Sequence, residues 1–339
     1  MIRAKVISFT ERGAKTGQRI AAALSGACVE QYARNVDLSL QATKLSRLVQ
    51  QAMVDCDLIL FVGATGIAVR ACAPYLQGKQ YDPAILVIDE NARFVISLLS
   101  GHLGGANALA DRLARDLQAQ PVITTATDNR GIFAVDTWAK NQNYTVYEVP
   151  QIKYISGALL KGDTVGIQSD FPVEGDLPEH IYFTDKCPCG IVLSVHVHQQ
   201  PFLHTLHLVP KIIHMGIGCR RGIPYEKIET AAQNILSAAN IPLSAIKQVA
   251  TINIKKDELG LCQFCQRHQI PLITYSAQQL IQASGNYTGS DFVQSIVGVD
   301  NVCERAAVLS SQNGTLLYRK TAVSGVTIAL AVQDWRVQF

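Results

Sequence analysis

The sequence predicts an α/β protein in which N-terminal and C-terminal α/β domains with mainly parallel sheets are joined by a small mixed middle domain. Two observations predict it. Towards both ends of the chain, short apolar runs alternate with segments of helical periodicity, a rhythm typical of parallel sheets. Between them, Gly, Pro and Asp turn signals are dense. We therefore expect domains at residues 1–143, 144–210 and 211–339.

The first domain alternates strands and helices. The continuously apolar run Leu58–Val62 is typical of a strand buried on both faces. Apolar residues spaced i, i+3 and i+4 over Ala106–Leu117 predict a helix that faces the core. The other expected strands are residues 4–9, 84–88, 94–98 and 121–124, and the other expected helices are residues 17–24, 38–53 and 66–76.

The rest of the chain divides into a turn-rich part and a second α/β part. In the middle domain, short strand-like runs lie between the turns, at residues 164–168 and 191–197. From residue 211 the alternation returns. Its expected strands are residues 212–217, 249–254, 271–274 and 327–332, and its expected helices are residues 225–238, 257–268 and 302–309.

Composition excludes several classes of protein. Hydrophobic residues make up 48% of the 339 residues and charged residues only 17%, against a usual ~25% charged. Such a chain buries a sizeable core and is not disordered. Thirty Lys and Arg against 27 Asp and Glu give a net charge of +3, too balanced for a nonspecific nucleic-acid binder. Any basic site must therefore be local.

The expected location is the cytoplasm, with no membrane partner. The longest apolar runs, residues 58–69 and 322–332, fall short of the ~18 residues that a spanning helix needs. Charged residues interrupt the first thirteen residues, which therefore have no signal-peptide core. The nine cysteines are an odd number spread over a long chain, a usage typical of free thiols in a reducing compartment.

Glycines follow the apolar run 58–62 in the segment FVGATGIAVR. Gly63, Thr65 and Gly66 form a turn before a helix that carries Arg70. Glycines let a ligand approach the backbone, and a helix N-terminus offers free N–H groups. These residues are candidate ligand contacts, and the alternative is a simple tight turn.

The segment SLLSGHLGGAN lies between an expected strand and the helix 106–117. His102 is the only histidine of the first domain and lies in a glycine-rich loop, which makes it a candidate base or proton shuttle. The alternative is a hydrogen-bonded structural histidine. Glu90, before the preceding strand, is a candidate second carboxylate or part of a solvated hairpin tip. Other candidates in the loop and helix entrance are Ser100, Gly101, Gly104, Gly105 and Asn107.

The segment GIGCRRG, residues 216–222, resembles a dinucleotide-binding loop with one residue too many. Gly216 and Gly218 are candidate ligand-approach positions. Arg220 and Arg221 suit carboxylates better than one pyrophosphate, because each guanidinium can bind a carboxylate through two hydrogen bonds. The alternative is a solvated Arg pair, which the helix dipole would disfavour at a helix start.

The sequence predicts no bound metal. Cys262 and Cys265 have the i, i+3 spacing of a helix face but no second Cys pair at zinc spacing. His196 and His198 would share one face of a strand, but no carboxylate or Cys nearby completes a site. We therefore interpret the former as core or incidental thiols and the latter as a surface histidine cluster.

Together these segments resemble the CbiG family of cobalt-precorrin-5A hydrolases of anaerobic cobalamin biosynthesis. The resemblance covers both α/β domains, and no middle-domain motif contributes to it. It implies a cobalt-bearing, partly methylated tetrapyrrole substrate with acetate and propionate arms and a δ-lactone on ring A. Hydrolysis of the lactone releases acetaldehyde and gives cobalt-precorrin-5B. The segments that carry the resemblance are residues 64–70, 82–110, 122–128, 132–139, 216–222 and 251–261.

The implied chemistry suggests roles for the candidate residues. Lactone opening needs a base and donors for an oxyanion. His102 is the best base, Glu90 an auxiliary acid or base, and Ser100 a possible nucleophile without a triad. No protein cofactor is expected, because the substrate carries the cobalt and its conjugated macrocycle can accept electrons. Candidate oxyanion donors are the N–H groups of Thr65, Gly66, Gly104 and Gly105, and candidate carboxylate clamps are Arg70, Arg220 and Arg221.

Two other readings remain open. A noncatalytic carrier of tetrapyrrole intermediates would need the arginines and glycines but not His102. A nucleotide-dependent α/β enzyme is disfavoured by the over-long glycine loop and by the lack of a ribose-binding acid. For either enzyme or carrier, a homodimer and transient contacts with neighbouring pathway enzymes are possible, and nucleic acid is not an expected partner.

Overall fold

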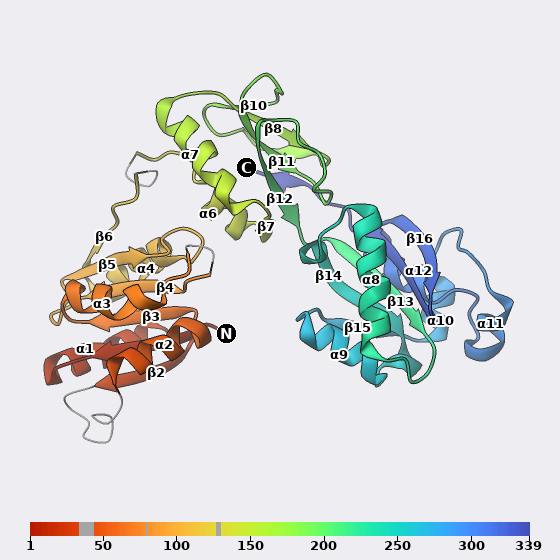
Figure 1. The fold of residues 1–339 in the computed structure, drawn as a ribbon, viewed down its shortest axis with the longest axis horizontal. Coiled ribbons are helices and arrows are strands. Elements are labelled where there is room, and N and C mark those ends of the chain that lie inside the picture. The colour runs from red at the N-terminus through yellow and green to blue at the C-terminus, as the bar shows by residue number, and fades with distance from the viewer. Residues whose placement is uncertain (34–43, 79–80, 127–129) are drawn as a thin grey trace. The chain divides into compact units, whose positions relative to one another are not determined.

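The computed structural model describes residues 1–33, 44–78, 81–126 and 130–339. It divides into two compact units, Met1–Lys140 and Asn141–Phe339 (Figure 1). The predicted α/β class with mainly parallel sheets is confirmed. None of the described helices combines the length and the apolar character needed to cross a bilayer.

The first unit contains a six-stranded sheet of order β2-β1-β3-β4-β5-β6. One face is covered by α1 and α4, which pack Ile20 and Leu113 against it, and the other by α2 and α3. The elements are β1 (Arg3–Ser8), α1 (Glu11–Ala23), β2 (Cys28–Ala33), α2 (Leu45–Asp55), β3 (Leu58–Val62), α3 (Thr65–Cys72), β4 (Ala84–Ile88), β5 (Phe94–Leu99), α4 (Ala106–Leu117), β6 (Gln120–Val122) and α6 (Val135–Asn141).

One strand reversal in this sheet decides where its loops lie. Strands β1 to β4 are mutually parallel, whereas β5 pairs antiparallel with β4 and parallel with β6. Ile88 pairs with Val95, and Ile85 pairs with Leu99. The carboxyl ends of β3 and β4 therefore lie along one edge of the sheet, where edge means the line formed by the strand ends. The carboxyl end of β5 lies along the opposite edge.

The second unit contains two five-stranded sheets and a two-stranded ribbon of β9 and β18. The first sheet has the order β10-β8-β11-β12-β7, and α7 packs on it. Its strands are parallel except β7. The elements of this part are β7 (Tyr144–Val146), α7 (Ile152–Lys161), β8 (Val165–Ser169), β9 (Val173–Glu174), β10 (Ile181–Tyr182), β11 (Cys189–Leu193) and β12 (His204–Pro210).

The other five-stranded sheet has the order β15-β14-β13-β17-β16. Strands β13, β14 and β15 are parallel, and the hairpin β16–β17 is antiparallel to them. Helices α8 and α9 contribute to its largest core cluster. The elements are β13 (Ile213–Cys219), α8 (Tyr225–Ala239), β14 (Ile246–Ile252), α9 (Leu259–Arg267), β15 (Leu272–Tyr275), α10 (Ala277–Gln282), α11 (Asp291–Val297), α12 (Cys303–Ser310), β16 (Thr315–Val323), β17 (Val326–Val332) and β18 (Val337–Gln338).

Several elements differ from the sequence prediction. The expected helix 38–53 lies partly outside the described residues, and α2 is observed from Leu45. Elements that the sequence analysis did not expect include β2, α6, α7, β12, α10, α11 and β16. In β16, Arg319 and Lys320 interrupt the apolar pattern because β16 is the outermost strand of its sheet and is partly exposed. In β12, buried His207 has the same effect on the pattern.

Candidate active site

The loop that follows β5 is built around close backbone contacts. Ser100 has a φ of 58° and Gly105 a φ of 86°, both in the left-handed region. A Cβ on Gly104 would lie 2.3 Å from the Ser100 Cβ and 2.6 Å from its carbonyl oxygen. Only glycine fits at position 104, and glycine is favoured at position 105. The glycines therefore shape the loop that carries His102.

The carbonyl groups of this loop cap the start of α4. The N–H groups of Ala106 and Asn107 donate to the carbonyl oxygens of Ser100 and Gly101, at 3.1 and 3.0 Å. The N–H of Gly105 donates to the carbonyl oxygen of His102 at 2.9 Å. This corrects the expectation of an open anion site at this helix entrance, and it removes Gly105 as an oxyanion donor in this conformation.

His102 lies beside a carboxylate that the sequence analysis did not assign. Its Nδ1 is 2.7 Å from the Thr137 hydroxyl oxygen and 4.0 Å from Asp136 Oδ1. The Asp136 side chain is 6% exposed and that of His102 17% exposed. Both partners lie in α6, within the segment 132–139 that also resembles the CbiG family. The hydroxyl and the carboxylate can hold the imidazole ring in one orientation, as the partners of a histidine general base do.

Lys140, one turn further along α6, fixes the same loop. Its ammonium group donates to the carbonyl oxygen of Leu103 at 2.8 Å. Burial lowers the pKa of Lys140. A Cβ on Gly105 would lie 2.9 Å from Lys140 Nζ, so the glycine also makes room for this contact. Helix α6 therefore holds the His102 loop at two points.

Asn107 is an anchor of the loop. It is buried, and its amide oxygen accepts a hydrogen bond from Ser97 at 2.6 Å. Its amide nitrogen donates to the Thr125 hydroxyl at 3.0 Å. A Cβ on Gly101 would lie 2.7 Å from the Asn107 amide oxygen. The structure thus gives Asn107 and Gly101 a structural role in place of the expected substrate contact.

Glu90 does not lie with His102. It follows β4, so it lies at the opposite edge of the sheet from the loop after β5. Its carboxylate accepts a hydrogen bond from the Thr10 hydroxyl at 2.7 Å, and its carbonyl oxygen accepts one from Thr16. The pairing of Glu90 with His102 as acid and base is therefore wrong, because β5 reverses the chain direction.

The first glycine motif lies at the Glu90 edge. Gly63 has a φ of 151°, and its N–H donates to the Ile88 carbonyl oxygen at 2.9 Å. Helix α3 then begins at Thr65, and the Arg70 guanidinium reaches back to Gly66, where a Cβ would lie 3.5 Å from it. Arg70 lines a hollow of about 280 Å³ between α2 and α3. Gly63, Thr65, Gly66 and Arg70 thus remain candidate contacts, but at a separate place from His102.

The third glycine motif is mostly strand. Gly216 and Gly218 lie within β13, and a Cβ on Gly216 would meet the Cys303 carbonyl oxygen of α12 at 1.8 Å. A Cβ on Gly218 would lie 2.6 Å from the Thr327 hydroxyl oxygen. These glycines allow close packing, which corrects their assignment as ligand-approach positions.

Arg220 and Arg221 lie beyond the end of β13 and are exposed. The Arg220 N–H donates to the Gly325 carbonyl oxygen at 3.0 Å, and the Gly222 N–H donates to Glu258 at 2.7 Å. Within the described parts of the chain, no carboxylate lies at ion-pair distance from either guanidinium. Both side chains therefore stay available for carboxylates in solution.

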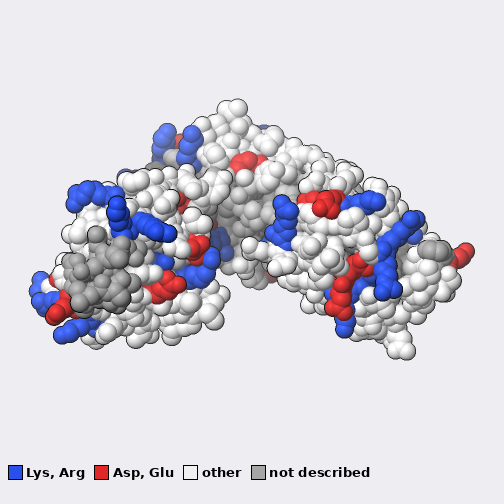
Figure 2. All heavy atoms as spheres, turned by 60° about the horizontal axis from the view of Figure 1, so that its bottom comes forward, with Lys and Arg blue, Asp and Glu red and all other residues white. Residues whose placement is uncertain are grey.

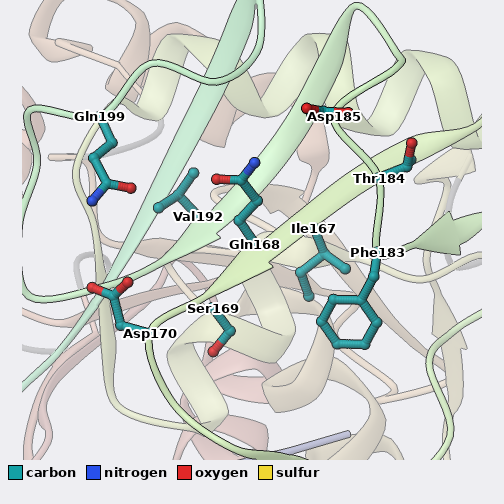
Figure 3. A pocket seen from close by; sticks show the side chains of 9 residues that line it. All are labelled: Ile167, Gln168, Ser169, Asp170, Phe183, Thr184, Asp185, Val192 and Gln199. Atoms are coloured by element: carbon teal, nitrogen blue, oxygen red, sulfur yellow. The ribbon is translucent and has the colours of Figure 1, made fainter.

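The middle segment holds a hollow of about 470 Å³ at the carboxyl ends of β8, β10 and β11 (Figure 3). Its lining contains the carboxylates of Asp170 and Asp185, on opposite sides of the hollow in Figure 3, and no Lys or Arg. Ser194 donates to Asp170 at 2.5 Å. Carboxylates repel carboxylates, so this hollow does not suit a polycarboxylate ligand.

The middle histidines are not arranged as the sequence predicts. Strand β11 ends at Leu193, so His196 and His198 do not share a strand face. His196 Nδ1 lies 2.9 Å from the carbonyl oxygen of Ala239, and the two imidazole rings are 6.0 Å apart. Cys262 and Cys265 lie in α9 as predicted. Over the described ranges, no group of three or more His, Cys, Asp or Glu has metal-binding geometry.

Comparison with known proteins covers most of the chain. Residues 47–128 match the family described as Cobalamin synthesis G N-terminal, residues 133–210 its Cobalamin biosynthesis central region, and residues 213–331 its Cobalamin synthesis G C-terminus. A cobalt-precorrin-5A hydrolase of Salmonella typhimurium is 38% identical over 296 residues, 84% of each chain. One of Priestia megaterium is 30% identical over 81% of this chain and 78% of its own.

A comparison with solved structures also gives a match that extends over nearly the whole chain. A putative cobalamin biosynthesis protein G homologue from Sulfolobus solfataricus covers 98% of this chain and 97% of its own, with 23% identity and a TM-score of 0.42. The family matches and the relatives extend over both units. The chain therefore belongs to the CbiG family of cobalamin-biosynthesis proteins.

Proposed function

We propose that this chain is a cobalt-precorrin-5A hydrolase. It opens the ring A δ-lactone of its corrinoid substrate with water and releases acetaldehyde, giving cobalt-precorrin-5B. The observation that carries the proposal is the His102 loop, in which an imidazole faces the shielded carboxylate of Asp136. The relatives named for this activity support the choice of reaction.

His102 acts as the general base in this scheme. Its Nδ1 lies beside Thr137 and Asp136, and in this scheme we assign proton exchange with the attacking water to Nε2. Nε2 takes a proton from the attacking water, and Asp136 stabilises the imidazolium that forms. The N–H of Gly104 is the oxyanion donor we assign to the loop. Ser100, held at a positive φ, is the alternative nucleophile.

Loss of acetaldehyde breaks a carbon–carbon bond. A hydroxyl on the departing two-carbon unit loses its proton, the C–O bond becomes a carbonyl, and the electron pair of the C–C bond moves into the macrocycle. The conjugated ring accepts these electrons, so the scheme needs no protein-bound cofactor, and the cobalt arrives with the substrate. In the second unit, the exposed Arg220 and Arg221 remain separate candidates for binding carboxylates.

The test is acetaldehyde release by the purified protein with its corrinoid substrate. We expect His102→Ala and His102→Gln to lower the rate by about 10²–10⁴-fold, the usual range for general acid–base catalysis, while corrinoid binding persists. Ser100→Ala should cost much less. If Ser100→Ala abolishes turnover and His102→Gln does not, the nucleophile is Ser100. Binding without any acetaldehyde from the wild type would favour a carrier over an enzyme.

A further inference from the structure

A basic hollow on the first unit lies outside the site described above. It has a volume of about 460 Å³ and is formed between α1 and the tip of the β4–β5 hairpin. On the face drawn in Figure 2, Lys and Arg gather in several patches, with Asp and Glu close to some of them. The residues that line the basic hollow are Arg12, Lys15, Thr16, Arg19, Glu90, Asn91 and Arg93.

The charges of the basic hollow are poorly balanced. Four cationic side chains face one carboxylate, that of Glu90, which already accepts a hydrogen bond from Thr10. Among the described residues, none of the four cations has an acidic partner at ion-pair distance. Like charges that line one hollow repel one another, and a bound polyanion would offset that repulsion.

The frame of the basic hollow is rigid even though its cations are exposed. The Thr16 hydroxyl donates to the Glu90 carbonyl oxygen at 2.7 Å and fixes the hairpin tip against α1. Asp89 accepts hydrogen bonds from the N–H groups of Arg93 and Phe94 at 2.7 and 2.8 Å, which fixes the backbone of Arg93. Arg12, Lys15 and Arg19 recur at i, i+3 and i+7, on one side of α1.

The position fits ligand binding. The basic hollow begins where β1 and β4 end, and ligands of open α/β sheets bind outside the carboxyl ends of the strands. We propose that the basic hollow binds acetate and propionate arms of a corrinoid, at the sheet edge opposite His102. The identity of the ligand rests on the proposed function, whereas the preference for a polyanion rests on the charges alone.

The test is a binding titration with two stable cobalt corrinoids, one with free carboxylic acid side chains and one with the same side chains amidated. We expect Arg12→Gln/Arg93→Gln to raise the Kd of the acid form about tenfold at low salt, since exposed charge pairs are individually weak. The amidated form should bind wild type and variant equally. Both substituted side chains are exposed, so the fold should persist, which circular dichroism would verify.

The matched control is Lys44→Gln/Arg47→Gln, which removes the same charge from α2 and its N-cap on the same unit. It should change the Kd of the acid form less than about twofold. Equal effects of the two double variants, or an equal loss with the amidated form, would overturn the proposal. Tighter binding of citrate than of the acid corrinoid at the basic hollow would also overturn it. Failure of the wild type to release acetaldehyde would instead count against the proposed function.

Discussion

The two edges of the first unit's sheet use glycine for different purposes. At the edge after β5, Gly104 lets the chain fold onto Ser100, and the loop is then held by α6 and by buried Asn107. At the edge after β3 and β4, Gly63 makes a turn into α3, and exposed cations line two hollows, the basic hollow and the hollow lined by Arg70. The first edge positions one imidazole and the second presents charge.

This difference supports the division of labour that we propose between catalysis and substrate recognition. Chemistry needs a side chain held in one orientation by shielded partners, which His102 has in Asp136 and Thr137. Recognition of a flexible polycarboxylate needs exposed donors, which the basic hollow and Arg70 supply. Both edges belong to one sheet, so substitutions at each can be compared within the same folded unit.

Apart from His102 itself, the largest effect should come from the shielded carboxylate of Asp136 at the His102 edge. Asp136→Asn keeps the size of the side chain and the N–H contact of Thr137 but removes the charge that stabilises the imidazolium. We expect the kcat of acetaldehyde release to fall by about 10–10²-fold with little change in KM. The loss should be smaller than that from removing His102, because the base itself remains. A variant with wild-type kcat would show that Asp136 only supports the fold.

A matched glycine pair tests whether the two edges differ as described. Gly104→Ala should destabilise the unit by about 2 kcal/mol, because its Cβ would meet backbone atoms of Ser100 that cannot give way. Gly66→Ala should be neutral or stabilise by less than about 1 kcal/mol, because its Cβ would meet only the end of the Arg70 side chain at 3.5 Å.

Urea denaturation of both glycine variants provides the measurement. If Gly66→Ala keeps full stability but loses corrinoid affinity, position 66 is a site of close ligand approach and the contact assigned to it is real. Equal destabilisation by both substitutions would remove the structural contrast between the edges.

The smallest effect should come from Glu90. The amide of Glu90→Gln can still accept the Thr10 hydrogen bond, and position 90 lies across the sheet from His102. We expect less than about a threefold change in acetaldehyde release, within the range of ordinary surface substitutions. A drop comparable to that of His102→Gln would place the chemistry at the β4 edge and reverse the assignment of the two edges.

The local pattern of residues determined much of this protein. The apolar run Leu58–Val62 predicts a doubly buried strand, and β3 is fully buried. The i, i+3, i+4 spacing of Ala106–Leu117 predicts the core-facing helix α4. His102 stands out in the sequence because a lone imidazole in a glycine-rich loop is chemically distinctive, and these local signals need no knowledge of distant residues.

The tertiary structure decided which candidates meet. Nothing local in the segment 94–99 shows that β5 runs antiparallel to β4, because strand direction depends on pairing across the sheet, and that single reversal separates Glu90 from His102. Asp136 is 34 positions from His102 and approaches it only when α6 docks. The segment around Gly216 resembles a ligand-binding loop in the sequence. In the structure, Gly216 packs against the backbone of α12, almost 90 residues away in the chain, and this contact is what requires glycine.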